Sequence, residues 1–215
     1  MKDKFDLIIF DLDGTLVNSI DWIVHCLQAA AETHGYQSPD EKSAKNTIGL
    51  CIQQAMATLF PGIDQKTQEQ LSETYSQVFF SQDINEKHLF VGVKNMLSTL
   101  RHNEYQLAIA TGKTRKGLDW AMQGTGLTNF FDITRSADES ASKPQPIMLE
   151  QIIEEMDVKR ERVVMVGDSI HDIQMANNAG IAAIAVSCGA NSEAELQQHN
   201  PLLNLSMTTD LLNFL

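Results

Sequence analysis

Cysteine is scarce in this chain of 215 residues, and long hydrophobic runs are missing from it. The three cysteines, Cys26, Cys51 and Cys188, are scattered and show no CxxC spacing. Isolated thiols in an odd number are typical of a reducing compartment and argue against a disulfide framework or a zinc site. No apolar stretch approaches the ~18 residues of a membrane span, and acids break the short apolar run near the start, unlike a secretion signal. We therefore expect a cytoplasmic protein without a membrane partner.

Positive charge is also in short supply. The chain has 16 lysines and arginines against 28 aspartates and glutamates, which gives a formal net charge of -12. Such a balance argues against nucleic acid or an anionic membrane surface as a partner. An anionic substrate would have to be attracted by local cations. We expect a monomer or a small homo-oligomer, and a hydrophobic content of 43% is enough for one large domain or two small ones.

Short apolar runs alternate with longer amphipathic stretches along most of the chain. Four runs are interpreted as buried strands: Leu7–Phe10, Leu107–Ala110, Val163–Val166 and Ile181–Val186. Apolar residues recur at helical spacing within residues 93–100 and 147–156. Strands that are buried on both faces and alternate with helices indicate an α/β fold, here a Rossmann-like parallel sheet.

Residues 17–86 differ from the rest because they contain no convincing strand. Apolar positions within 23–31, 48–60 and 71–80 predict three or four helices, and the turn signals "GYQSPD" and "FPGID" separate them. We therefore predict a core made of residues 1–16 and 87–215, with residues 17–86 as a helical insertion after the first strand.

The first predicted strand ends in two acids. Asp11 and Asp13 follow it directly, and Gly14 and Thr15 come next. One acid would be enough to cap the next helix. Two carboxylates at ~4 Å repel each other by roughly 4 kcal/mol at an effective dielectric of ~20, so a proton, a cation or a metal ion must offset the repulsion.

The other strand ends carry further polar groups. Thr111 and Gly112 leave the second strand, and Asp168 and Asp172 follow the third within one helical turn. Lys143 precedes a helix start, where a lysine opposes the helix dipole. Taken singly, these residues could equally form a turn, a helix cap or a solvated surface.

Together they suggest one site, because ligands bind at the carboxyl ends of the strands in an open parallel sheet. The four aspartates would form an acidic nest that suits a hard cation such as Mg²⁺. Thr111 and Lys143 would bind a phosphate that the metal also touches.

The order of these motifs resembles that of the haloacid dehalogenase superfamily. The matching segments are "DLDGT" (11–15), "TG" (111–112), "KP" (143–144) and "GDSIHD" (167–172). The helical insertion is similar to the helical cap of the phosphoglycolate-phosphatase-like branch, as are "TIGLCIQQA" (47–55) and "LFPG" (59–62). Many relatives have asparagine where this chain has Gly112, and an acid where it has Asn18.

The resemblance implies roles for the matching residues. Asp11 would be the nucleophile that forms an aspartyl phosphate, and Asp13 would be the general acid and base. Mg²⁺ would be bound by Asp11, by the main-chain carbonyl of Asp13 and by Asp168. The transferred phosphoryl group would be held by Thr111, Gly112 and Lys143. Asp172 would orient Lys143 or a metal-bound water. The implied activity is hydrolysis of a small phosphomonoester, with phosphoglycolate as a candidate from branch similarity.

Other functions fit part of the pattern. A phosphomutase would share every core residue. A dehalogenase would need Asp11 but neither a metal nor a second acid. A phospho-receiver signalling domain also has an acidic pocket with a threonine and a lysine, but such domains run to about 120 residues and have no helical insertion.

Two features leave alternatives open. The basic cluster Lys113, Arg115 and Lys116 either draws anions inward or forms a solvated face. His171 either touches the site or lies on a plain helix face. We also expect residues 47–54 to face the substrate, and hinges to lie near 16–19 and 85–92.

Overall fold

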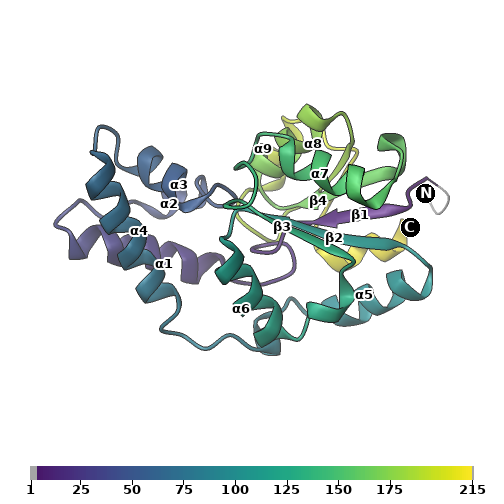
Figure 1. Ribbon diagram of the computed structural model, residues 1–215, viewed down its shortest axis with the longest axis horizontal. Helices are drawn as coiled ribbons and strands as arrows, with labels where there is room; N and C mark the ends of the chain where they lie inside the picture. Colours follow the sequence, from purple (N-terminus) through teal and green to yellow (C-terminus); the bar gives the residue numbers. More distant parts are fainter. Residues whose placement is uncertain (1–3, 215) are drawn as a thin grey trace.

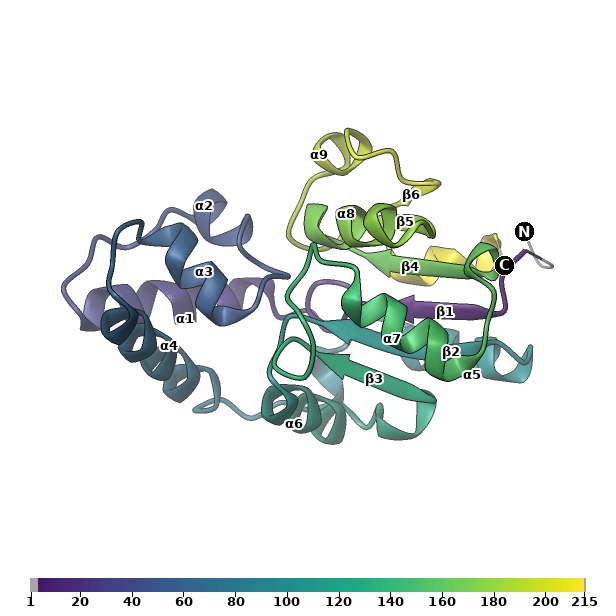
Figure 2. The ribbon, with the colours of Figure 1, turned by 45° about the horizontal axis from the view of Figure 1, so that its top comes forward.

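The computed structural model describes residues 4–214, so the outermost limits of the predicted core, residues 1–3 and 215, lie outside it. A twisted sheet with helices on both faces forms one part of the molecule, and a group of four helices lies beyond one end of the sheet (Figures 1 and 2). Among the described residues, no helix is both long enough and apolar enough to cross a membrane.

The sheet has six parallel strands in the order β3-β2-β1-β4-β5-β6. Their bounds are Leu7–Phe10 (β1), Gln106–Thr111 (β2), Ile133–Ser136 (β3), Val163–Gly167 (β4), Ala182–Val186 (β5) and Leu203–Leu205 (β6). The four predicted strands and the parallel α/β fold are confirmed. The sequence analysis missed β3 and β6, which are the two edge strands, because each is short and has no buried apolar run.

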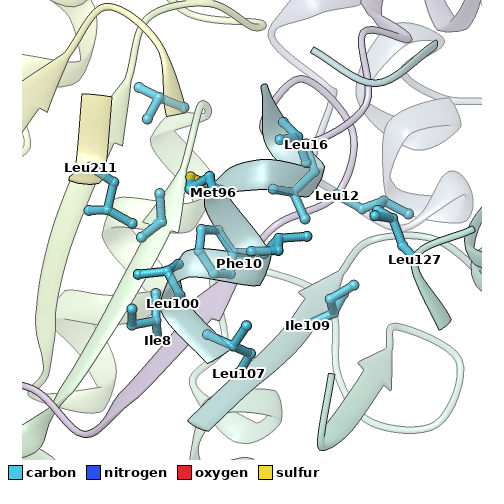
Figure 3. Close-up of a cluster of buried hydrophobic side chains, with 14 of the residues drawn as sticks. Ile8, Phe10, Leu12, Leu16, Met96, Leu100, Leu107, Ile109, Leu127 and Leu211 are labelled. Carbon is cyan, nitrogen blue, oxygen red and sulfur yellow. The ribbon is translucent and has the colours of Figure 1, made fainter. Parts of the chain in front are cut away.

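Helices cover both faces of the sheet (Figure 1). The helices on one face are α5 (Val93–His102), α6 (Arg115–Thr125) and the 3-10 helix η4 (Thr208–Asn213), and those on the other face are α7 (Ile147–Met156), α8 (Ile170–Ala179) and α9 (Glu193–Gln197). Side chains of β1 alternate between the two cores: Ile8 and Phe10 pack against α5, and Leu7 and Ile9 pack on the opposite face. Figure 3 shows Ile8 and Phe10 within the hydrophobic cluster on the α5 face of the sheet. All four side chains are fully buried, as expected for a central strand.

Four helices occupy the predicted helical insertion and supply most of a third hydrophobic cluster, which Ala190 and Trp120 of the core join. They are α1 (Ile20–Thr33), α2 (Glu41–Lys45), α3 (Ile52–Leu59) and α4 (Gln65–Phe79). The predicted helix over residues 48–60 is wrong at its start, because helix α3 begins only at Ile52. Gly49 has a φ of 100°, in the region that favours glycine, so the chain turns there instead of continuing a helix.

The two connections between the sheet and the helical insertion lie side by side. The main-chain N–H of Asn18 donates to the His88 carbonyl at 2.7 Å, and that of Phe90 donates to the Leu16 carbonyl at 3.1 Å. The 3-10 helix η1 (Glu86–His88) ends at this crossing, and two further short turns, η2 (Thr128–Phe130) and η3 (Arg160–Arg162), lie in the core. The division at residues 17 and 86 stays a prediction.

Candidate active site

The centre of the sheet positions the first acids of the site. Strand order reverses at β1, which has β2 on one side and β4 on the other. Asp11 follows β1 and Asp168 follows β4, so the two side chains leave neighbouring strands at the same edge. In open α/β sheets this switch point is where ligands bind.

Lys143 joins two of the predicted acids. Its ammonium nitrogen lies 2.6 Å from Oδ1 of Asp11 and 2.6 Å from Oδ1 of Asp172, and the lysine has no exposed surface. Burial raises the pKa of Asp11 to about 7, although Lys143 opposes the change. Burial also favours the neutral amine, but Asp11 and Asp172 outweigh it and raise the pKa of Lys143. A charged lysine is therefore held in place by Asp172, which is one of its two expected roles.

Asp168 is fully buried beside these groups. The Thr15 hydroxyl donates to its Oδ1 at 2.7 Å, and the Ala190 N–H donates to its Oδ2 at 2.7 Å. Burial raises the pKa of Asp168 well above its usual range, Asp11 and Asp172 add to that effect, and the two donors only partly offset it. Gly14 is necessary here, because it has a φ of 79° and a Cβ atom on it would lie 2.2 Å from the Asp168 carboxylate. Sequence reasoning noted Thr15 but gave it no role.

Three of the acids form a cluster that fits a metal ion. Asp11, Asp168 and Asp172 each offer a carboxylate oxygen, and these oxygens lie within 4.8 Å of one another. Buried oxygen donors of this kind suit a hard cation such as Mg²⁺. A divalent cation would also offset the raised pKa values of Asp11 and Asp168. The carboxylate of Asp13 is not part of the cluster, and the expected role of its main-chain carbonyl stays a prediction.

Asp13 instead contacts two residues on its other side. The Ser19 hydroxyl donates to its Oδ1 at 2.6 Å, and the Lys113 ammonium lies 3.0 Å from its Oδ2. The same ammonium lies 4.0 Å from the centre of the Phe79 ring in α4. Lys113 is thus a largely buried partner of the site and does not belong to a solvated face.

The other two members of the basic cluster make contacts away from the site. Arg115 pairs with Glu139 and lies 3.3 Å from Asp119, and Lys116 lies over the Phe80 ring at 4.9 Å. Only Lys113 of the three reaches the site, and the sequence did not distinguish it from its neighbours.

Thr111 and Gly112 lie at the end of β2 and face the same space as Asp11 and Asp13. The Thr111 hydroxyl accepts a hydrogen bond from the Lys113 N–H at 3.3 Å. A Cβ atom on Gly112 would lie 2.4 Å from the Gly49 carbonyl oxygen and 2.6 Å from that of Leu50. A larger residue such as asparagine would not fit at this position, because the helical insertion touches the core backbone here.

Hydrogen bonds tie the loop before α3 to the core. The Cys51 N–H donates to the Ser142 hydroxyl at 2.8 Å, next to Lys143. Nε2 of His171 lies 2.9 Å from the Asn46 carbonyl. His171 therefore neither reaches the reacting groups nor lies free on a helix face, since it contacts the helical insertion.

A cavity of about 140 Å³ lies between the helical insertion and the strand ends. Its core side includes Asp11, Asp13, Thr111 and Gly112, and its other side includes residues 47–53 together with α4. Lys143, Asp168 and Asp172 join this set through their contacts with Asp11. All the predicted site residues are therefore brought together. Residues 47–53 of the segment expected to face the substrate line the cavity, whereas Gln54 lies outside the lining.

Residues 8–186 match the model of the haloacid dehalogenase-like hydrolase family. The chain belongs to that family. The probable phosphatase IndB of Dickeya dadantii is 32% identical over 91% of this chain and 86% of its own. The pyrophosphatase PpaX of Halalkalibacterium halodurans is 29% identical over 98% of this chain and 96% of its own. A predicted phosphoglycolate phosphatase from Haemophilus somnus has the same fold, with a TM-score of 0.87, 23% identity and 97% of each chain covered.

Family membership confirms the resemblance inferred from the four motifs. As a haloacid dehalogenase-like hydrolase with phosphatases among its relatives, the chain is an enzyme of the phosphatase type. The receiver-domain alternative is set aside on this ground.

Proposed function

We propose that the protein hydrolyses a small phosphomonoester through an aspartyl phosphate on Asp11, with Mg²⁺ as cofactor. The observation that carries the proposal is the position of Asp11. Lys143 holds one of its carboxylate oxygens at 2.6 Å, while the residue also lines the cavity. A carboxylate held from one side and open to the cavity on the other is placed for attack on a bound phosphorus atom.

In the first step, a carboxylate oxygen of Asp11 forms a bond to phosphorus and the ester P–O bond breaks. Asp13 gives its proton to the departing oxygen, which leaves as an alcohol. In the second step, a water attacks the phosphorus, Asp13 takes a proton from it, and the Asp11 carboxylate is restored as phosphate departs. Lys143, Thr111 and Gly112 bind the phosphoryl oxygens in both steps, because the transfer depends mainly on positioning and charge neutralisation.

Mg²⁺ would be held by Asp11 and Asp168, together with the main-chain carbonyl of Asp13, and when bound it would neutralise charge on the phosphoryl group. Asp172 supports this arrangement because it fixes Lys143 at 2.6 Å.

The acid step requires a change at Asp13. An ion pair with Lys113 uses the carboxylate form, whereas donation to the leaving group uses the protonated form. The Asp13–Lys113 contact must therefore open, or Lys113 must turn to the phosphoryl oxygens, when substrate binds.

The identity of the ester is a separate matter. Phosphoglycolate is one candidate because of the branch that the chain resembles, and the helical insertion, taken as residues 17–86, would select among esters. A phosphomutase is the alternative activity, because it would use the same core residues and pass the phosphoryl group to a sugar instead of water.

The test is hydrolysis of p-nitrophenyl phosphate with Mg²⁺, with EDTA, and with Mg²⁺ restored. We expect activity that depends on Mg²⁺, and a phosphorylated protein whose label maps to Asp11 by mass spectrometry after acid quenching. Asp119→Asn, on an exposed face of α6, serves as the matched control for Asp11→Asn. Activity in Asp11→Asn, or a label on another residue, would refute the proposal. A label that passes to added sugar phosphate faster than to water would favour the mutase.

A further inference from the structure

We infer that the alcohol part of the substrate is small and uncharged, so that esters with a second anionic group, such as phosphoglycolate, and pyrophosphate are poor substrates. The inference rests on the proposed phosphatase function and concerns the half of the cavity that the helical insertion supplies. It differs from what the names of the relatives would suggest.

The wall opposite the acids is apolar. Ile23, Leu27, Ile48 and Phe79 line the cavity and are each at least nine-tenths buried. The cavity volume of about 140 Å³ must also hold the phosphoryl group, because Asp11 and the end of β2 form part of its lining. A charged group against this wall would lose its water without gaining a partner.

Cations are nearly absent from the lining. Among the described residues, Lys113 is the one basic residue that lines the cavity, and it is already bound to Asp13 and to the Phe79 ring. Lys143 is bound to Asp11 and Asp172. If Lys113 turns to the phosphoryl oxygens when substrate binds, no lysine among the described lining residues is left to pair with a second anion.

The acids of the lining make the field unfavourable as well. Asp11, Asp13 and Asp138 all line the cavity. Two lysines of the helical insertion, Lys42 and Lys45, pair with Glu195 and Glu41 and lie outside the lining. A carboxylate or a second phosphate would therefore meet apolar surface and like charge.

A neutral polar group with an unused donor faces this space. Tyr75 of α4 lines the cavity, and among the described residues its hydroxyl has no hydrogen-bond partner. By contrast, the Thr47 hydroxyl donates to the Ala44 carbonyl and the Ser76 hydroxyl donates to the Ser72 carbonyl, each at 2.8 Å. The hydroxyl of Tyr75 thus offers a hydrogen bond to an uncharged alcohol part.

The experiment compares 2-phosphoglycolate with its uncharged amide, which has the same number of heavy atoms. Hydrolysis of p-nitrophenyl phosphate checks the proposed function in the same preparation. We expect kcat/KM for the amide to exceed that for phosphoglycolate by about 10²-fold, the scale on which a site rejects a group that it leaves unpaired. We expect pyrophosphate to be hydrolysed no faster than phosphoglycolate.

A charge added to the rim provides the matched test. Gln53 lines the cavity on α3 and is exposed, so Gln53→Arg places a cation there without burying it. We expect this variant to reduce the preference for the amide by about tenfold or more. Gln77→Arg adds the same charge on an exposed position of α4 outside the lining, and it should leave the preference unchanged.

The outcomes separate the two ideas. If p-nitrophenyl phosphate is hydrolysed but phosphoglycolate or pyrophosphate is preferred over the amide, the inference is wrong and the proposed function stands. The inference would also be overturned if Gln53→Arg and Gln77→Arg changed the preference for the amide equally, because the charge at the cavity rim would then not set that preference. No Mg²⁺-dependent hydrolysis of any ester would overturn both.

Discussion

The ammonium nitrogen of Lys113 lies 3.0 Å from Oδ2 of Asp13 and 4.0 Å from the centre of the Phe79 ring. One side chain of the core thus contacts both the proposed general acid and the helical insertion. A cation over an aromatic ring contributes about 0.5–2 kcal/mol, more when it is shielded from water. Lys113 is therefore placed so that it could couple the position of α4 to the protonation of Asp13.

Replacing this lysine should affect both partners. We expect Lys113→Met to lower kcat/KM by about 10- to 100-fold, because Asp13 loses its partner and α4 loses a contact with the core. Hydrogen exchange should speed up in residues 75–79 at the same time. Lys116→Met, which removes an exposed lysine over the neighbouring Phe80, is the control. Loss of activity without faster exchange in α4 would contradict the link.

Asp11→Asn should abolish turnover yet stabilise the metal-free protein. The pKa of Asp11 is raised from 3.8 to about 7 in the folded state. Between those values the folded protein holds a proton that the unfolded chain has released, so stability falls as pH rises from about 4 to 7. An asparagine removes this loss.

Thermal unfolding in EDTA tests the pH dependence. The Tm of the variant and of the wild type should be close near pH 4, and the variant should be higher by several degrees at pH 8, on a scale of about 2–4 °C per kcal/mol. A difference that shrinks as the pH rises would show that Asp11 ionises easily in the folded protein.

Asp13→Asn should distinguish leaving groups. p-Nitrophenolate departs without a proton, whereas an alkoxide needs one, so the variant should lose about 10²-fold or more on an alkyl phosphate and clearly less on p-nitrophenyl phosphate. The measurement is kcat/KM on both esters for the variant and the wild type. Ser19→Ala, which removes the hydroxyl that donates to Asp13 at 2.6 Å and to the Val17 carbonyl at 3.4 Å, should affect both esters alike. Equal losses in Asp13→Asn, with hydrolysis of the aspartyl phosphate unaffected, would remove Asp13 from the acid role.

Gly112→Ala should hold the helical insertion away from the core. The new Cβ would lie within 2.4–2.6 Å of the carbonyl oxygens of Gly49 and Leu50, so one of the two backbones must move. We expect a fall in kcat/KM of about tenfold or more with the fold retained, because closure excludes water and completes the site. Gly117→Ala is the control, since its Cβ would meet nothing nearer than 3.5 Å. Unchanged kinetics in Gly112→Ala would show that this contact is not needed for turnover.

The linear sequence determined the central strands and the acids at their ends. An unbroken apolar run such as Leu7–Phe10 can be satisfied only by burial on both faces, and β1 is indeed fully buried. Two acids after such a run conflict with burial unless something binds them, so Asp11 and Asp13 were identifiable without coordinates. The edge strands β3 and β6 were not, because a half-buried strand of three or four residues has no distinctive pattern.

Only the tertiary structure decided which side chains meet. Thr15 reaches Asp168 across 153 positions of sequence, and Lys113 is held by Asp13 and by a ring of the helical insertion. The periodicity of apolar residues indicates whether a residue is buried, but it does not indicate which distant segment packs against that residue. The three members of the basic cluster look alike in the sequence, and the packing of α4 over the strand ends makes Lys113 differ from Arg115 and Lys116. The apolar wall of the cavity and the free hydroxyl of Tyr75 likewise arise from helices that the chain brings together only on folding.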